Sequence, residues 1–276
     1  MSLLKTLYKL PNNKRFDEGG IRVKTNKKMN VKPLFTILTV VLNNERYLEQ
    51  TIKSVLKQSF KDYEYIVIDG GSSDKSLDII KKYQNKINYW VSEKDKGIYD
   101  AFNKGMSLAQ GQFIGIINSD DIYRTNTLKI ISKYIKKNNK IDFIFGSVKK
   151  HWGVLHGYKP RKIHYSWGFY SSHSTGFFLS LKAAKKVGLY NLKYKYHADY
   201  DYFYRLIVGH KMKGIATKKK EITGVFRRGG FSSTIHYRNL FKEEMLIRFN
   251  NGQNKILIFI IFLYKLFKHF NKIIKK

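Results

Sequence analysis

Two adjacent carboxylates follow an apolar run near the middle of the chain. The run spans residues 113–117, Phe-Ile-Gly-Ile-Ile, and the dipeptide Asn-Ser separates it from Asp120 and Asp121. This composition predicts a buried strand that delivers both carboxylates at its carboxyl end, where open α/β sheets bind ligands. Two neighbouring carboxylates in an apolar setting repel each other and resist desolvation, so a hard cation or a basic partner is expected to hold them. Alternatively, one of them caps the helix expected to begin near Thr125.

Further acids stand where other predicted strands end. Asp69 directly follows the apolar run at 63–68, and Asp95 follows the run at 87–91. The carboxyl ends of parallel strands share one edge of a sheet, so these acids and the adjacent pair would line a single crevice. Accidental helix caps would explain one or two of them, but four in a chain with only 20 Asp and Glu residues favour a common site.

The elements that would position these acids alternate along the chain. Strands are expected at 34–41, 63–68, 87–91, 113–117 and 141–148, with helices between them at 45–58, up to 83, 98–109 and 125–137. Successive strand–helix units predict right-handed parallel crossovers. The fold class is therefore α/β, with a mostly parallel central sheet flanked by helices. Beyond residue 150 we expect a strand at 176–181 and helices at 182–187 and 199–208.

Composition changes mark three segments. Residues 1–32 are basic and without sustained periodicity, which predicts a loosely held basic N-terminal arm. Lys5 and Lys9 interrupt the first ten residues, so no signal peptide is evident and a cytoplasmic protein is expected. Residues 33–235 form the main domain, with halves at 33–124 and 125–235. Residues 236–276 form a C-terminal helical, basic and apolar tail.

The tail has an apolar run followed by interleaved lysines. Nine consecutive apolar residues, Ile256 to Tyr264, are fewer than the roughly 20 that span a bilayer. Apolar and basic side chains then alternate to the end, and the chain has no acid after Glu244. An amphipathic helix on an anionic membrane surface is expected. Packing against the domain or a partner subunit is the alternative.

The net charge narrows the partner classes without selecting one. It is +33, from 53 Lys and Arg against 20 Asp and Glu. Such chains meet nucleic acid, anionic membranes or phosphorylated small molecules. The absence of cysteine excludes disulfides, thiolate zinc sites and cysteine nucleophiles. Residues 42–46 contain no glycine, which argues against a dinucleotide-binding loop after the first strand.

Characteristic motifs follow one another along residues 34–121: Thr39-Val-Val-Leu-Asn-Asn-Glu45, Ser54-Val-Leu-Lys-Gln58, Ile68-Asp-Gly-Gly-Ser-Ser-Asp74, Ser92-Glu-Lys-Asp-Lys-Gly-Ile-Tyr-Asp-Ala-Phe-Asn-Lys-Gly105 and Asn118-Ser-Asp-Asp121. Together they resemble the donor-binding half of family 2 glycosyltransferases, which have the GT-A nucleotide-diphospho-sugar transferase fold. The likeness is greatest to bacterial-type transferases that build surface polysaccharides. His173-Ser-Thr-Gly-Phe-Phe178 and Ala198-Asp-Tyr-Asp-Tyr-Phe-Tyr-Arg205 resemble acceptor-side segments, so the likeness extends over about residues 34–235.

The resemblance implies roles for the donor-side residues. Asp69 would hydrogen-bond the nucleotide base, with Asn43 or Glu45 nearby on base or ribose. Asp95 and Lys104 would lie near the phosphates or the sugar.

The resemblance also implies a metal site. Asp121, helped by Asp120, would hold Mn²⁺ or Mg²⁺ against the donor diphosphate, where the cation neutralises the charge of the leaving group. Arg227 and Arg228 could close over the diphosphate, since arginine pairs well with phosphate, although a solvated basic turn is an alternative.

On the acceptor side, Asp199 would match the catalytic base that removes a proton from the acceptor hydroxyl. Asp201 lies at the start of the same expected helix and is the alternative. Direct attack on the anomeric carbon would invert its configuration, so no nucleophilic side chain is required.

The expected protein is an inverting, metal-dependent glycosyltransferase. It would use a nucleotide-sugar donor, a UDP-sugar above all, and a glycan or lipid-linked saccharide acceptor. It would be cytoplasmic and peripherally attached to an anionic membrane surface, with no nucleic-acid partner. The alternatives are a basic nucleic-acid-binding protein, which the strand-end carboxylates argue against, and a nucleotidyltransferase, which would need an early glycine-rich phosphate loop.

Overall fold

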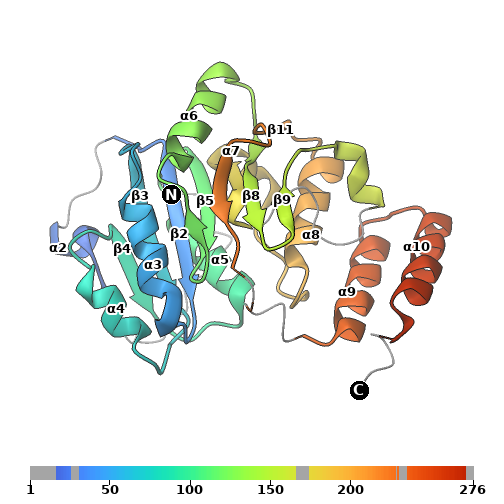
Figure 1. Cartoon of the computed structure of the whole chain (residues 1–276), viewed down its shortest axis with the longest axis horizontal. Coiled ribbons are helices and arrows are strands. Elements are labelled where there is room, and N and C mark those ends of the chain that lie inside the picture. The colour runs from blue at the N-terminus through green and yellow to red at the C-terminus, as the bar shows by residue number, and fades with distance from the viewer. Residues whose placement is uncertain (1–16, 26–30, 166–173, 228, 230–234, 272–276) are drawn as a thin grey trace.

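The computed structural model describes residues 17–25, 31–165, 174–227, 229 and 235–271. A large sheet with helices on both faces occupies one side of the molecule, and a pair of C-terminal helices stands at the opposite end (Figure 1). Arg228, which was expected to close over the diphosphate, lies outside the described residues.

Four parallel strands form the central part of the large sheet, as the strand–helix alternation predicts. They are ordered β4-β3-β2-β5 and comprise β2 (Phe35–Val41), β3 (Tyr63–Asp69), β4 (Tyr89–Ser92) and β5 (Phe113–Asn118). The crossovers contain α3 (Glu45–Leu56), α4 (Ser76–Lys82) and α5 (Ile98–Leu108). Every residue of β2 is buried, because helices cover both faces of this part of the sheet.

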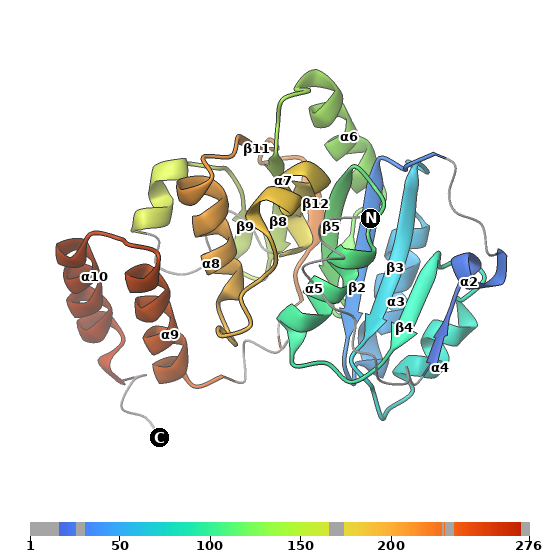
Figure 2. The ribbon, with the colours of Figure 1, turned by 180° about the vertical axis from the view of Figure 1, so that it is seen from behind.

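Each face of the sheet has its own apolar core. Leu38 and Val40 of β2 face the core shared with α5, α7 (Leu181–Val187) and α8 (Ala198–Tyr204). Ile37 and Val41 point the other way, into the core shared with α3, α4 and α6 (Thr127–Lys137). This alternation follows from the two-residue period of a strand. Figure 2 shows α5, α7 and α8 in front of the sheet.

Beyond β5 the large sheet becomes mixed. β10 (Phe177–Ser180) lies antiparallel between β5 and β7 (Phe143–Phe145), and β11 (Gly214–Ala216) pairs parallel with β7. A smaller sheet has the order β6-β12-β8-β9. Its strands are β6 (Ile122–Tyr123), β8 (Ser147–Lys150), β9 (Gly153–Leu155) and β12 (Ile222–Val225).

The single strand expected at 141–148 is in fact two strands in two sheets. The chain passes from β7 to β8 at Gly146, where an added Cβ would lie 2.3 Å from Oγ1 of Thr223. The apolar run continues across this point, so the pattern alone could not show the break.

Shorter helices complete the second half. They are η1 (Pro160–His164), η2 (Ser174–Gly176) and η3 (Arg205–Gly209), the last a π-type continuation of α8. The expected helix at 199–208 thus changes its hydrogen-bonding pattern at Arg205.

The expectation of a loosely held N-terminal arm is wrong for Asp17–Thr25. β1 (Asp17–Gly19) pairs antiparallel with β4 at the sheet edge, and α2 (Ile21–Thr25) follows. The guanidinium of Arg22 is paired with the fully buried carboxylate of Glu64 on β3 and donates to the carbonyl of Leu108 at 3.1 Å. A buried carboxylate needs a cation, and the segment that looked like a free arm supplies it.

The tail is helical, as expected. It consists of α9 (Tyr237–Asn250) and α10 (Lys255–Lys268), and the two helices pack side by side beyond α8 (Figures 1 and 2). Among the described helices none is long and apolar enough to cross a membrane.

Candidate active site

A cleft of about 1250 Å³ opens at the carboxyl edge of the parallel strands. Its walls come from the turn after β2, the loop between β4 and α5, the end of β5, the start of α8 and the two C-terminal helices. Four of the expected site residues line it: Asn43, Asp95, Asp120 and Asp199. Residues distant in sequence therefore meet at one surface, as the parallel topology predicts.

Asp69 is buried behind this surface and organises the loop after β3. Its carboxylate accepts hydrogen bonds from the hydroxyl of Ser92 at 2.6 Å and from the backbone N–H of Ser72 at 3.0 Å. The Ser72 hydroxyl donates to it at 2.5 Å and accepts from the backbone N–H of Asn43 at 2.8 Å. Asn43 has a φ of 49°, a left-handed conformation that asparagine tolerates. Asp69 thus holds Asn43 at the cleft through Ser72.

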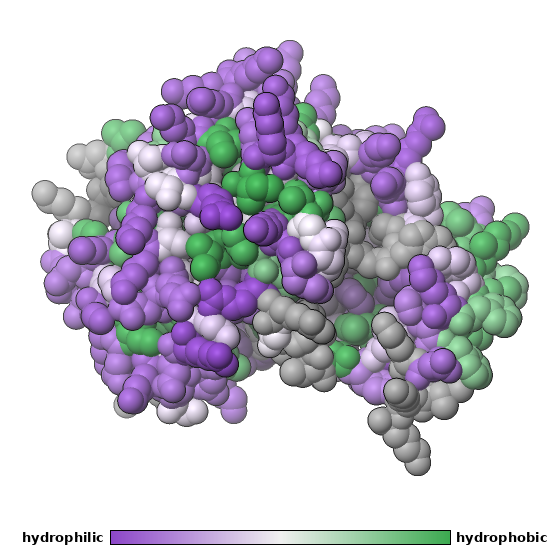
Figure 3. All heavy atoms as spheres, in the orientation of Figure 1, coloured by the Kyte–Doolittle hydropathy of each residue, from purple (hydrophilic) through white to green (hydrophobic). Residues whose placement is uncertain are grey.

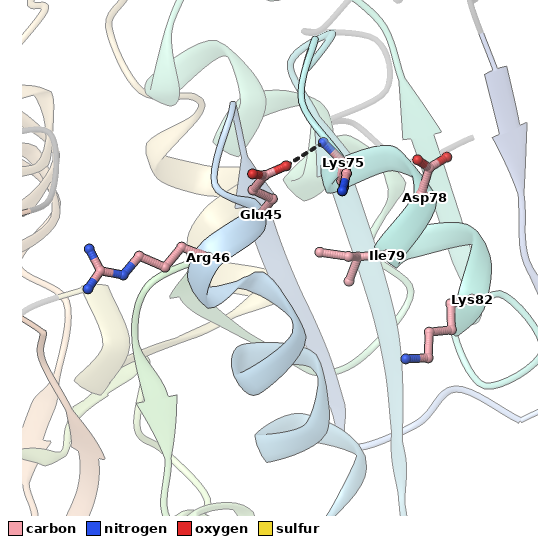
Figure 4. A pocket seen from close by; sticks show the side chains of 6 residues that line it. All are labelled: Glu45, Arg46, Lys75, Asp78, Ile79 and Lys82. Carbon is pink, nitrogen blue, oxygen red and sulfur yellow. Dashed lines mark hydrogen bonds between the residues drawn. The ribbon is translucent and has the colours of Figure 1, made fainter.

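Glu45 stands away from the cleft, at the neighbouring starts of α3 and α4. Its carboxylate accepts from the backbone N–H of Lys75 at 2.9 Å, the bond drawn in Figure 4. The backbone N–H of Glu45 in turn donates to Asp74 at 2.9 Å. These bonds satisfy free N–H groups at two helix starts. Glu45, which the resemblance placed near the base or ribose, thus lines a separate, shallow hollow of about 590 Å³ in this structure.

Asp95 and Lys104, expected together near the donor, occupy different environments. The half-buried carboxylate of Asp95 lines the cleft and accepts from the backbone N–H of Gly97 at 2.9 Å. Burial raises its pKa. The ammonium of Lys104 is fully buried in α5 and paired with Glu93 at 2.9 Å. Lys104 therefore lies behind the wall, where its positive charge also favours the ionised form of Asp95.

The adjacent carboxylates at the end of β5 diverge. Asp121 is fully buried and accepts hydrogen bonds from the backbone N–H of Arg227 at 3.1 Å and from the Thr175 hydroxyl. Asp120 is partly exposed and lines the cleft. In this structure Asp120 is therefore the carboxylate that faces the cleft, and Asp121 is the one that hydrogen-bonds within the protein.

Burial makes both carboxylates harder to ionise. Desolvation, followed by the charge of Asp120, raises the pKa of Asp121 to about 7. Desolvation also raises the pKa of Asp120, while the positive charge of Arg227 opposes the rise. A cation at the cleft would relieve this repulsion. Among the described residues, no three His, Asp or Glu side chains gather closely enough to hold a metal ion by themselves.

Asp199 projects into the cleft from the start of α8. Its Oδ1 accepts from the backbone N–H of Tyr200 at 2.8 Å and lies 3.3 Å from the Tyr99 hydroxyl. Burial raises its pKa, and the charge of His197 opposes the rise. The alternative, Asp201, is buried and bonded to Arg205 Nε at 2.9 Å and Asn251 Nδ2 at 3.0 Å. Between the two, Asp199 is the carboxylate available to a ligand.

Arg227 lies at the margin of the cleft. Its guanidinium stands 4.1 Å above the ring centroid of Tyr47, a cleft residue, and donates to Gln50 at 2.8 Å. Its backbone N–H binds Asp121, so the segment after β12 is tied to the end of β5.

Lys150 is a buried cation that the sequence did not single out. Its ammonium lies 4.0 Å from the ring centroid of Phe226, which lines the cleft, and the side chain is 3% exposed. Burial lowers its pKa to about 8, while the charges of Asp121 and Asp199 oppose the fall. In the sequence it belongs to a Lys-Lys pair that resembles a solvated turn. Only the alternating burial along β8, with Lys149 outward and Lys150 inward, distinguishes the two.

Known proteins resemble this chain in sequence. The family profile described as Glycosyl transferase family 2 matches residues 36–197. A PGL/p-HBAD biosynthesis glycosyltransferase of Mycobacterium bovis is 27% identical over 229 residues, which cover 76% of this chain and 84% of that protein. An uncharacterized glycosyltransferase of Methanocaldococcus jannaschii is 30% identical over 190 residues, 64% of this chain and 65% of that one.

Solved structures show the same fold. S. aureus TarS superposes with a TM-score of 0.64 at 18% identity, covering 87% of this chain and 44% of TarS. Residues 1–349 of TarS in complex with UDP-GlcNAc give a TM-score of 0.63 at 19% identity, covering 87% and 73%. The mannosyltransferase PcManGT from Pyrobaculum calidifontis, in complex with GDP-Man and Mn²⁺, gives 0.61 at 13% identity, covering 88% and 72%.

Proposed function

This chain belongs to glycosyl transferase family 2 and is a glycosyltransferase, and from that premise we propose that it transfers a sugar from a UDP-sugar to an acceptor hydroxyl with inversion. The supporting observation is that Asp120 and Asp199 line the same cleft from different elements, the first just after a strand end and the second at a helix start. In this proposal Asp120 serves the donor and Asp199 the acceptor. The choice of UDP is supported by TarS, which binds UDP-GlcNAc.

On the donor side, Asp120 would hold Mn²⁺ or Mg²⁺, which prefer carboxylate oxygens. When bound, the cation neutralises the charge that develops on the departing diphosphate. Asp121 then acts as a positioning residue, because it ties β5 to Arg227 and Thr175. Asn43, held at the cleft by the Asp69–Ser72 bonds, would contact the nucleoside. Asp95, which lines the same cleft, would contact the sugar.

On the acceptor side, Asp199 accepts the proton of the attacking hydroxyl. As the acceptor oxygen bonds to the anomeric carbon, the bond from that carbon to the diphosphate breaks and its electron pair leaves with the diphosphate. A single displacement of this kind inverts the anomeric centre. The burial that raises the pKa of Asp199 makes it a stronger base than an exposed carboxylate, and the N–H of Tyr200 orients it.

We propose as acceptor a glycan or lipid-linked saccharide at the cytoplasmic surface of a membrane. The lining of the cleft also includes Tyr194 and Tyr196 and residues of α9 and α10, which supports an acceptor site beyond Asp199. Aromatic side chains along such a path suit the apolar faces of sugars and lipids.

Donor binding tests the proposal directly. UDP-GlcNAc with Mn²⁺ should raise the melting temperature of the protein, since a ligand bound only by the folded state stabilises it. Asp120→Asn should abolish the Mn²⁺-dependent part of the shift, whereas Asp78→Asn, which changes an exposed side chain of α4, should retain it. A panel including GDP-mannose checks the nucleotide. An equal shift in EDTA, or in Asp120→Asn, would refute the metal role.

A further inference from the structure

Helix α10 is packed with its apolar side outward. Ile256, Phe259, Ile260 and Phe267 are 71%, 60%, 55% and 77% exposed, whereas Lys265 is 3% exposed. At about 100° per residue these four apolar residues lie on one side of the helix and Lys265 on the other. We call the side of α10 formed by Ile256, Phe259, Ile260 and Phe267 the outer face. Figure 3 shows hydrophobic side chains gathered over α10 at the right-hand end of the molecule.

Buried charges fix this orientation. Lys265 is paired with Glu244 of α9, and the same carboxylate accepts from Arg248 at 2.8 Å. Beside the lysine, Ile261 is 1% exposed and fills the contact between the helices. Rolling α10 to bury its outer face would leave Glu244 without one of its cations and carry Lys265 out of the contact. The apolar outer face is therefore a built feature of the fold.

The charge around the outer face selects its partner. Lys255 and Lys268 lie at the two ends of α10, and the sequence contains no acid between Glu244 and its last residue, Lys276. A second copy of the chain would bring these like charges, and net charges of +33, together. An anionic lipid surface accepts the apolar side chains and the lysines at once.

The side of α10 opposite the outer face lines the cleft. Lys265 and His269 contribute to the cleft wall, together with Tyr237 and Phe241 of α9. A helix with its side chains is about 10 Å across. With the outer face on a bilayer, this end of the cleft stands roughly one helix diameter above the headgroups.

We propose that α10 docks on an anionic lipid bilayer through its outer face and so presents the α9–α10 end of the cleft to acceptors that project from that surface. The docking surface follows from α10 alone. Its link to the acceptor rests on the proposed function, because it takes the cleft to be the site of transfer.

Vesicle binding by the full chain tests the docking. The protein should cosediment with phosphatidylglycerol–phosphatidylcholine vesicles and bind phosphatidylcholine alone at least tenfold more weakly. Phe259→Glu/Phe267→Glu should reduce binding to the anionic vesicles at least tenfold. The matched control Trp152→Glu alters a side chain that is 57% exposed in the turn between β8 and β9, and should bind like the parent.

The outcomes separate the possibilities. Equal binding by the double variant would overturn the proposal, since the lysines alone would then account for attachment. So would a dimer in sedimentation that the double variant abolishes without any vesicle binding, because a second copy would then cover the face. Donor-induced stabilisation, measured on the same proteins, should be unchanged. Its absence from the parent would count against the proposed function and leave the docking result intact.

Discussion

At the scale of single residues, the adjacent acids Asp120 and Asp121 show how one step along the chain changes a role. The turn after β5 carries Asp121 into the protein, where Thr175 and the Arg227 backbone bind it, and leaves Asp120 at the cleft. A carboxylate that is hydrogen-bonded within the protein stabilises the fold, whereas one that is exposed at the cleft can bind a ligand. The same contrast separates Asp201, paired with Arg205, from Asp199.

Asp199→Asn should lower turnover by about 10² to 10⁴, because the acceptor hydroxyl loses its base. Donor binding, measured by thermal shift with UDP-GlcNAc and Mn²⁺, should not change. The comparison variant Asp201→Asn should instead lower the melting temperature, since it weakens a pair with Arg205. A variant of Asp199 that retained full turnover would place the base elsewhere.

The raised pKa of Asp121 makes stability depend on pH. Its pKa is about 7 in the folded protein and near the ordinary 3.8 when unfolded, so folding favours the protonated form. The resulting stability is fully present below about pH 4 and is lost as the pH rises through 7. In EDTA, the free energy of unfolding should therefore fall between about pH 4 and 7 and level off above, and Asp121→Asn should flatten this fall. Parallel pH curves for parent and variant would show that Asp121 ionises normally.

At the scale of elements, the segment β1–α2 completes the sheet edge. Arg22→Ala should destabilise the protein by about 3–5 kcal/mol, because it leaves Glu64 buried without its cation. Chemical denaturation measures this loss. The double variant Arg22→Ala/Glu64→Gln should recover part of it, since no uncompensated charge remains. Equal losses in the single and double variants would mean that packing of Arg22, and not its charge, matters.

At the scale of the whole molecule, Glu244 joins α9 to α10 and, through Arg248, joins this helix pair to the main domain. It binds Lys265 of α10 and Arg248, whose guanidinium also donates to the carbonyl of His164 in η1 at 2.7 Å. The cleft therefore has one wall made by the sheet and another made by helices that the charge cluster holds in place.

Lys265→Ala should loosen α10 without unfolding the main domain. Glu244 keeps Arg248 but loses its second cation, so protection of α10 amides from hydrogen exchange should fall while that of β2–β5 amides is retained. Lys268→Ala, at the exposed end of the same helix, serves as the control. Equal exchange in the two variants would show that the buried pair does not hold α10.

Much of this protein could be inferred from its residues. Continuous apolar runs predicted β2 to β5 because parallel strands are buried on both faces, and the motifs predicted the glycosyltransferase family, which the comparison with known proteins confirms. That membership identifies the enzyme class as glycosyltransferase, and so decides against a nucleotidyltransferase. The gathering of Asp95 and Asp120 at one edge followed from parallel topology, which sequence alternation is sufficient to reveal.

Other features depended on long-range contacts that no local pattern records. The break between β7 and β8 occurs where Gly146 packs closely against Thr223. The N-terminal segment Asp17–Thr25 is fixed on the domain by the ion pair between Arg22 and Glu64. The same holds for side-chain environments, which depend on the neighbours of each residue. Asp121 is buried while Asp120 faces the cleft, and the side chains of Lys150 and Lys265 point into the protein. Residue type and spacing by themselves determined the kind of fold, the family and the edge where chemistry is placed. Tertiary packing decided which carboxylate faces the cleft and which side of α10 faces water, because burial and charge pairing are properties of the assembled chain.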